Sequence, residues 1–552
     1  MPGDRKLIII GFDGADPGLI ARWLDELPGF RALAESGCWG PLRSTPNMNS
    51  ASAWSTFATG KNPGKHGIFY FDDCAVDNYE MRFINASFRK GPTFWRLASD
   101  AGLNVQVINV PISFPAEPVN GLMVAGMDAP GVSSRGFTHP PGLVNELNRV
   151  TGGYLVESGV PGYIKAGNRR SAVKRMRETM DCRLKASLHL MKNHPWELFV
   201  TVFTEIDVAQ HFFWHGLMPG HPEHRDDDPL KDTVKEIYTE SDRCLQKLLE
   251  EAERAGATVM IVSDHGGGIN TRGNEMLNPW LEAAGFLRRS GSGAASRNPL
   301  GDAVAKAASS GFKLIDRTLN REAKLALARW FPALRRRVQS GMVFQGIDWD
   351  GTRAFSAGAR DEIWINTKGR HPRGTVEPGG EYDALVNELR ESLAKAADPD
   401  TGEGLVEGVR HRSEVYNGPY ADRAPDILVR WRQTKLFSAM STKSAPAVRM
   451  PPAGRATCTG GHSPDGILFA RGGGIAAGGK ISGASIQDVA PTALALLGIP
   501  VPEDMDGAAA PAIVKETPKT SPAHSDAKEE QEYTEEEKKI IEDRLRGMGY
   551  IS

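Results

Sequence analysis

The sequence predicts an α/β fold: a three-layer α/β/α sandwich with a mostly parallel central sheet, plus a helical insertion or cap. Two observations support this prediction. Short β-branched runs, each closed by glycine or a polar residue, indicate buried strands. Helical patterns lie between several of these runs, and strands that alternate with helices form parallel sheets covered on both faces. Ligands bind such sheets at the carboxyl ends of the strands.

The first predicted strand covers residues 6–12, KLIIIGF, and places Asp13 at its carboxyl end. Helical patterns occupy residues 91–102 and 230–256. The same apolar run with a polar or glycine end recurs at residues 104–110, 197–207, 257–268 and 466–472.

Changes in composition divide the chain into four parts. Residues 1–287 form the first part of the α/β core, and residues 344–512 form its second part with a small subregion. Between them, residues 288–343 combine a Gly/Ser/Ala-rich linker with a basic amphipathic helical stretch, which predicts a cap or lid. Residues 513–552 are predicted as a polar linker and a charged C-terminal helix.

Composition limits the class of protein. The formal net charge of -2 gives no general attraction to nucleic acid or anionic membranes, so an anionic substrate must be bound by local groups. The cysteines are scattered and lack CxxC spacing, which argues against a disulfide framework and favours a reducing compartment. No apolar run is long enough for a signal peptide or a membrane span, so we expect a cytoplasmic protein.

Three segments carry acidic or histidine side chains in positions suited to metal ions. Asp207 and His211 are four residues apart, on one face of a helical turn, although this spacing is also common on ordinary helices. Asp264 and His265 follow a buried strand and precede three glycines, which would let the backbone pass close to a ligand. His462 lies between glycines in a predicted loop, where an exposed histidine is the ordinary interpretation.

Together with Asp13 and the hydroxyl-rich residues 48–69, these segments resemble the alkaline phosphatase superfamily, specifically its type I phosphodiesterase/nucleotide pyrophosphatase branch. The similarity includes the closing LRGMGY more weakly, and it covers most of the chain except the basic insertion and the polar linker. The matching motifs, in the order of the family, are IIIGFDGAD, ASAWSTFATGKNPGKHGIF, VFTEIDVAQHFFWHG, VSDHGGG and GGHSPDG.

The resemblance implies two divalent metal ions per chain, usually zinc with manganese as an alternative, and a Thr or Ser nucleophile ten residues before the Gly of a TG pair. Counting back from Gly60 gives Ser50, and the rivals Thr45 and Ser52 fit this distance less well. The ligand set that the resemblance implies is Asp207, His211 and His462 for one metal, and Asp13, Asp264, His265 and the Ser50 oxygen for the other.

The predicted ligand set also makes chemical sense. Mixed carboxylate and imidazole ligands suit zinc or manganese, and two ions can hold both the attacking and the leaving oxygen of an in-line displacement. A helix predicted over residues 51–58 would place its N-terminus beside Ser50, where it favours phosphoryl oxygens. We therefore expect attack by Ser50 on phosphorus, followed by hydrolysis of a phosphoserine intermediate.

The leading hypothesis is a hydrolase of phosphodiester or pyrophosphate bonds in a nucleotide or another small phosphorylated substrate. Nucleotide pyrophosphatases of this branch use an Asn to hold a phosphate oxygen where this chain has Phe71, so a phosphomonoesterase stays open. A sulfatase is disfavoured because SASAW lacks the required Pro and Arg. A non-catalytic anion-binding protein is the hypothesis from another class. His66 and His215 lie near the motifs and are predicted to be structural.

Overall fold

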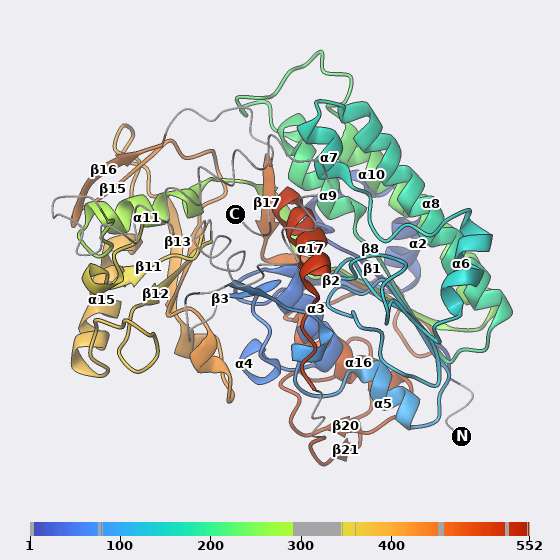
Figure 1. The fold of residues 1–552 in the computed structure, drawn as a ribbon. Helices are drawn as coiled ribbons and strands as arrows, with labels where there is room; N and C mark the ends of the chain where they lie inside the picture. The colour runs from blue at the N-terminus through green and yellow to red at the C-terminus, as the bar shows by residue number, and fades with distance from the viewer. Residues whose placement is uncertain are drawn as a thin grey trace.

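The computed structural model describes residues 5–74, 79, 81–290, 344, 346–358, 360–450, 458–524, 529–548 and 550. A nine-stranded sheet forms the centre, in the order β19-β2-β18-β9-β1-β8-β5-β6-β7 (Figure 1). Its strands are β1 (Leu7–Phe12), β2 (Cys38–Arg43), β5 (Val105–Ile108), β6 (Gly121–Val124), β7 (Thr138–His139), β8 (Leu198–Phe203), β9 (Thr258–Val262), β18 (Asp465–Arg471) and β19 (Gly479–Lys480).

The central sheet is mostly parallel, as predicted. Strands β6, β5, β8, β1 and β9 run in one direction, so the carboxyl ends of β8, β1 and β9 meet at one edge. Strand β18, predicted from residues 466–472, differs because it runs antiparallel between β9 and β2. The apolar pattern identifies a buried strand but contains no information on its direction.

Both faces of the sheet are covered, which explains why every residue of β1 is buried. Ile8, Ile10 and Phe12 point into the core of one helical layer, while Leu7 and Ile9 point into the core of the other. The first layer holds α1 (Pro17–Trp23), α2 (Pro28–Ser36), α6 (Leu143–Thr151), α8 (Arg169–Asn193), α9 (Glu205–Phe213) and α10 (Thr233–Arg254), and the second holds α3 (Ser50–Thr59), α5 (Phe94–Asp100) and α16 (Val489–Leu496) (Figure 1).

A smaller region with its own hydrophobic core stands beside the sandwich, on the left in Figure 1. In the sequence, the predicted basic insertion falls between the first helix of this region and its strands, and residues 291–343 of the insertion lie outside the described residues. The elements of this region are a four-stranded sheet in the order β11 (Ala354–Phe355), β12 (Glu362–Ile365), β14 (Ile427–Trp431) and β13 (Val406–His411), the hairpin of β15 (Ala439–Thr442) and β16 (Ala445–Arg449), and the helices α11 (Gly273–Ala283) and α15 (Gly380–Ala394).

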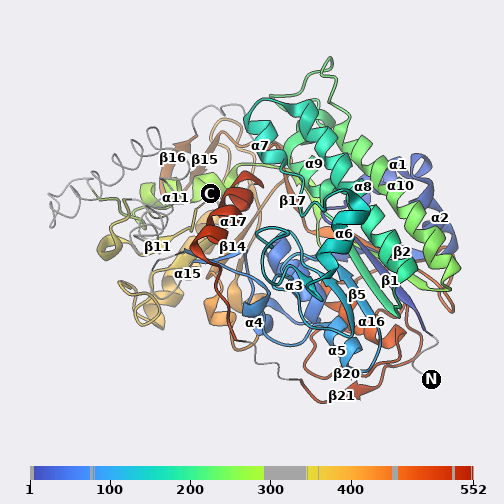
Figure 2. The same ribbon diagram turned by 45° about the vertical axis from the view of Figure 1, so that its right-hand side comes forward.

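The C-terminal helix α17 (Glu535–Met548) packs against the sandwich and lies where the two regions meet (Figures 1 and 2). The sequence predicts a charged helix here, and the structure adds that one face of it is apolar and buried through Ile541, Leu545 and Met548. Just before the helix, the Tyr533 hydroxyl donates a hydrogen bond to the Asp128 carbonyl at 2.8 Å. The helix is therefore an integral part of the core.

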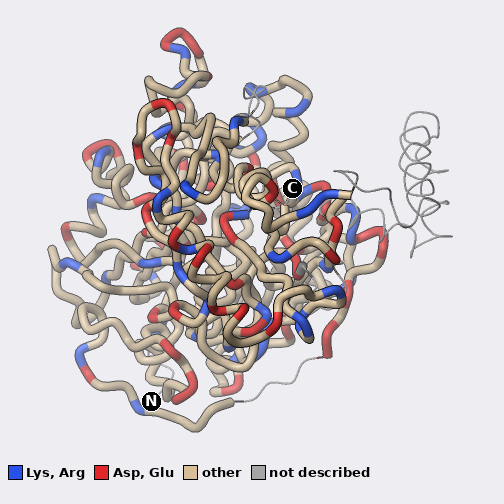
Figure 3. The backbone as a smooth tube through the Cα atoms, turned by 90° about the vertical axis from the view of Figure 1, so that its left-hand side faces the viewer, with Lys and Arg blue, Asp and Glu red and all other residues tan. Residues whose placement is uncertain are grey.

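Acidic and basic residues are interspersed along the described backbone (Figure 3). In the part of the chain that the structure describes, every helix is too short or too polar to cross a membrane.

Candidate functional site

Three neighbouring parallel strands bring the predicted acidic residues together at one edge of the sheet. Asp13 follows β1 directly, Asp264 comes two residues after β9, and Asp207 lies in the first turn of α9, which follows β8. Backbone contacts fix the three segments, because the Asp207 N–H donates to the Asp13 carbonyl at 3.1 Å and the Gly14 N–H donates to Asp264 Oδ1 at 3.2 Å. This edge is where the fold class predicts a ligand.

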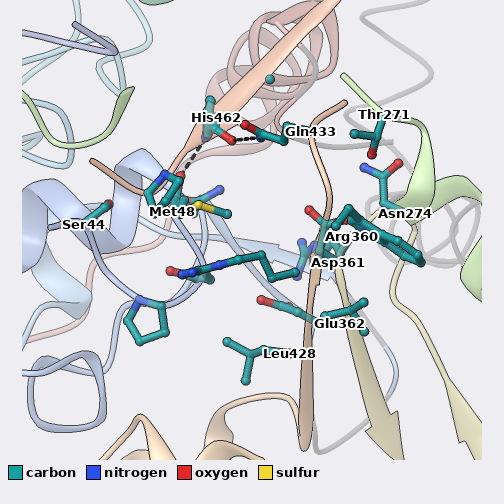
Figure 4. A pocket seen from close by; sticks show the side chains of 18 of the residues that line it. Ser44, Met48, Thr271, Asn274, Arg360, Asp361, Glu362, Leu428, Gln433 and His462 are labelled. Carbon is teal, nitrogen blue, oxygen red and sulfur yellow. Dashed lines mark hydrogen bonds between the residues drawn. The ribbon is translucent and has the colours of Figure 1, made fainter. Parts of the chain in front are cut away.

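The first group of predicted ligands consists of Asp207, His211 and His462. Asp207 Oδ1 lies 3.4 Å from His211 Nε2 and 3.5 Å from His462 Nε2, and the two imidazole nitrogens are 3.0 Å apart. His462 Nδ1 donates to the Met48 carbonyl at 2.7 Å (Figure 4). The lone pair of Nε2 therefore faces Asp207. One carboxylate oxygen and two imidazole nitrogens therefore converge on one point.

His462 does not lie in a loop, contrary to the sequence prediction. It belongs to β17 (Gly460–Ser463), which pairs antiparallel with β10 (Gly266–Ile269), the run of glycines after His265. A Cβ atom on Gly267 would lie 2.2 Å from the Gln210 side-chain oxygen on α9. Gly267 is thus required for close packing of this strand pair on α9.

The second group consists of Asp13, Asp264 and His265, all fully buried. His265 Nε2 lies 3.3 Å from Asp264 Oδ2 and 3.6 Å from Asp13 Oδ1, and both of these carboxylate oxygens lack a hydrogen-bond partner among the described residues. The other Asp13 oxygen accepts a 2.8 Å hydrogen bond from Trp54 Nε1 on α3. Trp54 reaches this position because Gly11 leaves room for its ring, since a Cβ there would lie 2.7 Å from the indole.

Ser50 joins the second group at the start of α3. The Asn49 side chain caps the helix by accepting a hydrogen bond from the Ala51 N–H, so Ser50 stands in its first turn. Its Oγ lies 3.0 Å from His265 Nε2. His265 Nδ1 donates to the Gly266 carbonyl, so Nε2 of the neutral ring accepts the hydroxyl proton.

The two rival hydroxyls of the sequence prediction have other surroundings. Thr45 Oγ1 donates to the Asn47 side chain at 3.0 Å. Ser52 is buried, and its hydroxyl has no hydrogen-bond partner among the described residues. Of the three candidates, the structure places Ser50 beside a predicted metal ligand.

Burial and mutual repulsion perturb the charges of both groups. Burial raises the pKa of Asp13 well above its usual value and that of Asp264 to about 7, and the neighbouring carboxylates add to both rises. Burial also opposes ionisation of Asp207, but the His211 imidazole outweighs it and lowers the pKa of Asp207. Asp207 in turn raises the pKa of His211, while burial lowers that of His265 to about 3.

These residues fit two divalent cations. Buried carboxylate oxygens without a partner are costly, and a cation bound between them removes the cost. The donors of both groups, carboxylate oxygen and imidazole nitrogen, are types that zinc and manganese accept. His265 also lies close to the first group, since its ring stacks on that of His462 at 3.7 Å and its nitrogen converges with Asp207 and His462.

A comparison with known protein families matches residues 7–465 to the type I phosphodiesterase / nucleotide pyrophosphatase family. The chain belongs to this family. It is therefore a metal-dependent hydrolase of phosphoester bonds. No curated protein matches the chain.

Solved structures of related fold cover nearly the whole chain. Phosphonoacetate hydrolase from Sinorhizobium meliloti, in complex with phosphonoformate, has 14% sequence identity and a TM-score of 0.50, and the alignment covers 90% of this chain and 96% of that one. Murine ectonucleotide pyrophosphatase/phosphodiesterase 5, in complex with AMP, has 12% identity and a TM-score of 0.43, with coverages of 90% and 95%. At 14% identity, the similarity to phosphonoacetate hydrolase supports the fold alone.

A cavity of about 820 Å³ opens between the first ligand group of this phosphodiesterase-family chain and the smaller region. His211 and His462 line it from the sandwich, and Trp431 lines it from the smaller sheet. Figure 4 shows Arg360 and Glu362 facing Met48 and His462 across the cavity. Arginines from both regions line the cavity: Arg43, Arg272, Arg360, Arg410 and Arg430.

Sequence reasoning missed Tyr550, which also lines this cavity and whose hydroxyl lies 2.7 Å from Asp207 Oδ2. The sequence signal for Tyr550 was the family-like LRGMGY ending. Motif spacing alone could not connect this ending with Asp207, which lies far away in the sequence. Phe71 is buried and packs on the Tyr550 ring at 4.9 Å.

The two histidines predicted to be structural have partners outside the ligand groups. His66 Nε2 lies 2.9 Å from Thr56 Oγ1, and His215 lies 2.9 Å from Arg169. A separate cluster of Glu146, His189 and His194 also has the geometry of metal ligands. Both of its imidazoles are satisfied by hydrogen bonds to Glu146 Oε1, at 2.7 and 2.8 Å.

Proposed function

We propose that the protein hydrolyses phosphodiester or pyrophosphate bonds in a nucleotide or another small phosphorylated substrate, with two zinc ions and a phosphoserine intermediate on Ser50. One observation carries this proposal: the buried Ser50 hydroxyl lies 3.0 Å from His265, at the helix end beside both ligand groups. Asp207, His211 and His462 would hold one ion, and Asp13, Asp264, His265 and the Ser50 oxygen the other.

The surroundings of Ser50 suit a phosphoryl group. The N-terminal end of α3 carries a partial positive charge, which favours phosphoryl oxygens. The cavity beside it has room for a nucleotide-sized molecule. Of the arginines that line it, Arg43, Arg272, Arg360 and Arg430 form ion pairs with carboxylates of the protein, so the helix end is the feature that supports a phosphorylated substrate.

The proposed reaction has two steps. The bound cations supply Lewis-acid stabilisation of the attacking and leaving oxygens. Ser50 Oγ forms a bond to phosphorus as the bond to the leaving oxygen breaks, and that group departs with the proton that Ser50 loses. Water then cleaves the phosphoserine bond and restores the hydroxyl. With His265 Nε2 on the cation, the capped helix and the packing around Ser50 hold the nucleophile in place during both steps.

A substrate screen tests this function. Zinc-loaded protein is assayed on matched monoester, diester and nucleotide pyrophosphate substrates, and we expect turnover of the last two. Ser50→Ala should lower kcat by several orders of magnitude, on the order of 10³-fold or more. Ser52→Ala is the matched control, because Ser52 is a buried serine of the same helix, and it should retain activity. A Ser50→Ala protein with near-normal activity would refute the role of the nucleophile.

Phosphomonoester hydrolysis is the second candidate, and Phe71 favours it. The side chain at this position is apolar and packed against Tyr550, so it offers no hydrogen bond to a phosphate oxygen. Turnover of monoesters alone in the same screen would replace the diesterase proposal and leave the site assignment intact.

A further inference from the structure

The C-terminal segment reaches the centre of the candidate metal site. The Tyr550 hydroxyl lies 2.7 Å from Asp207 Oδ2 and 3.4 Å from Ser50 Oγ. A residue two positions before the last residue of the sequence thus contacts both a predicted ligand and the predicted nucleophile. These contacts join sequence positions separated by 343 and 500 residues.

The position of Tyr550 is fixed on several sides. Its ring packs on Phe71 at 4.9 Å and meets the His211 ring edge-on at 5.8 Å. Its backbone N–H donates to the Leu545 carbonyl at 3.0 Å, which ties it to the end of α17. An aromatic ring held by packing and a backbone hydrogen bond presents its hydroxyl in one direction.

The helix before Tyr550 is itself anchored to the sandwich. Arg544 donates to the Ala129 carbonyl at 2.7 Å and also to the Met127 carbonyl. Together with the buried face of Ile541, Leu545 and Met548, these contacts hold the segment on the core. We use the term C-terminal tail for residues 529–548 and 550.

We propose that Tyr550 is a positioning residue of the metal site, supplied by the C-terminal tail, which fixes the Asp207 carboxylate and faces Ser50. This inference rests on the proposed function. The phenol donates its one proton to Asp207 Oδ2, so Oδ1 stays directed at His211 and His462. Partners that orient a metal ligand in this way typically contribute 10-fold to 100-fold to metal affinity or activity.

A blocking role for the tail fits the geometry less well. The phenol contacts Asp207 Oδ2, whereas the atoms that converge as ligands are Asp207 Oδ1, His211 Nε2 and His462 Nε2. These three atoms lie 3.0 to 3.5 Å from one another with the phenol in place. The hydroxyl therefore supports the carboxylate through Oδ2, the oxygen that is not directed at the two imidazoles.

Tyr550→Phe in the full-length protein tests the proposal, because it keeps the ring against Phe71 and removes only the hydroxyl. We expect zinc retention against a chromophoric chelator to weaken about 10-fold to 100-fold for one of two ions. At saturating zinc, kcat should fall by a similar factor with KM within about twofold. Tyr550→Leu should match Tyr550→Phe in zinc retention if the hydroxyl is what matters.

Tyr533→Phe is the matched control, because it removes a hydroxyl hydrogen bond of the same tail at Asp128, away from the metal ligands. It should leave zinc retention and kcat near the wild-type values. Unchanged zinc retention and kcat in Tyr550→Phe would overturn the proposal, and higher activity would show that the tail blocks the site. If the wild-type protein hydrolyses no substrate, the proposed function fails, yet the chelator measurement still tests the contact between Tyr550 and Asp207.

Discussion

The two groups of candidate metal ligands balance their charges in opposite ways. In the first, the Asp207 carboxylate faces two imidazoles, and the shifts that lower the pKa of Asp207 and raise that of His211 favour an ion pair. In the second, Asp13 and Asp264 face the neutral His265, and each keeps one carboxylate oxygen without a partner among the described residues. The carboxylate charge of the first group is compensated without a metal, and the carboxylates of the second group are not.

This difference shows where a cation contributes most to the fold. Buried carboxylates that repel each other cost free energy, either as charge or as protons that must be retained. A divalent cation removes that cost in the second group, whereas in the first group it competes with a proton on His211. We therefore expect the two groups to differ most clearly in their effect on the stability of the metal-free protein.

The largest expected effect is on the stability of the metal-free protein. Asp207→Asn should lower its free energy of unfolding by about 3 kcal/mol, because the buried imidazoles of the first group lose their charged partner. Urea unfolding of chelator-treated protein at pH 7.5 measures the change.

The same substitution in the second group gives the opposite sign. Asp264→Asn keeps the acceptor for the Gly14 N–H and replaces a carboxylate that repels Asp13, so the metal-free protein should gain about 1 kcal/mol. Activity should nevertheless be lost, because the second group then lacks a charged ligand. If both variants destabilise the metal-free protein equally, the two groups do not differ as argued.

The pH dependence of metal affinity gives a smaller effect that also separates the groups. A cation must displace the proton of Asp264, whose pKa is raised to about 7, so affinity at the second group should fall about tenfold from pH 8 to pH 6. Because the pKa of His211 is raised above that of free imidazole, the first group should keep gaining affinity above pH 7. Chelator competition at pH 6, 7, 8 and 9 measures both trends, and Asp264→Asn isolates the first group. Identical profiles would contradict the assignment.

The strands of the fold could be predicted from the sequence because each buried strand is recognised from a short local pattern of residues. An apolar run closed by Gly11 and Asp13 defines a buried strand and its carboxyl end without reference to the rest of the chain. Strand direction is not local, and β18 shows this, since its antiparallel pairing depends on β2 and β9 on either side. The packing role of Gly267 was beyond the sequence for the same reason, because it depends on Gln210 of α9.

The predicted site residues came from motif order, and the structure brings all seven together. Their supporting contacts were beyond the sequence. Tyr550 meets Asp207 only because α17 docks on the core, and Trp54 meets Asp13 only because Gly11 leaves space between them. Such contacts join segments that no spacing rule connects. They set the orientation of ligands whose identities the motifs already indicate.

The smallest predicted effect concerns the Trp54 contact in the second group. Trp54→Phe removes the 2.8 Å hydrogen bond from the indole to Asp13 Oδ2, which frees that carboxylate to rotate. A hydrogen bond of about 1 kcal/mol corresponds to about a fivefold loss of metal affinity, measured by chelator competition at pH 8. The effect should be confined to the second group, because the first group does not contact Trp54 among the described residues.

Trp95→Phe is the matched control for lost volume. Trp95 is also fully buried in the layer of α3 and α5, but its indole N–H has no hydrogen-bond partner among the described residues. Both variants should lower thermal stability by similar amounts through the space they leave. Only Trp54→Phe should weaken metal binding, since only its indole orients a ligand. Equal metal affinities in the two variants would mean that packing alone, rather than the hydrogen bond to Asp13, holds the second group in place.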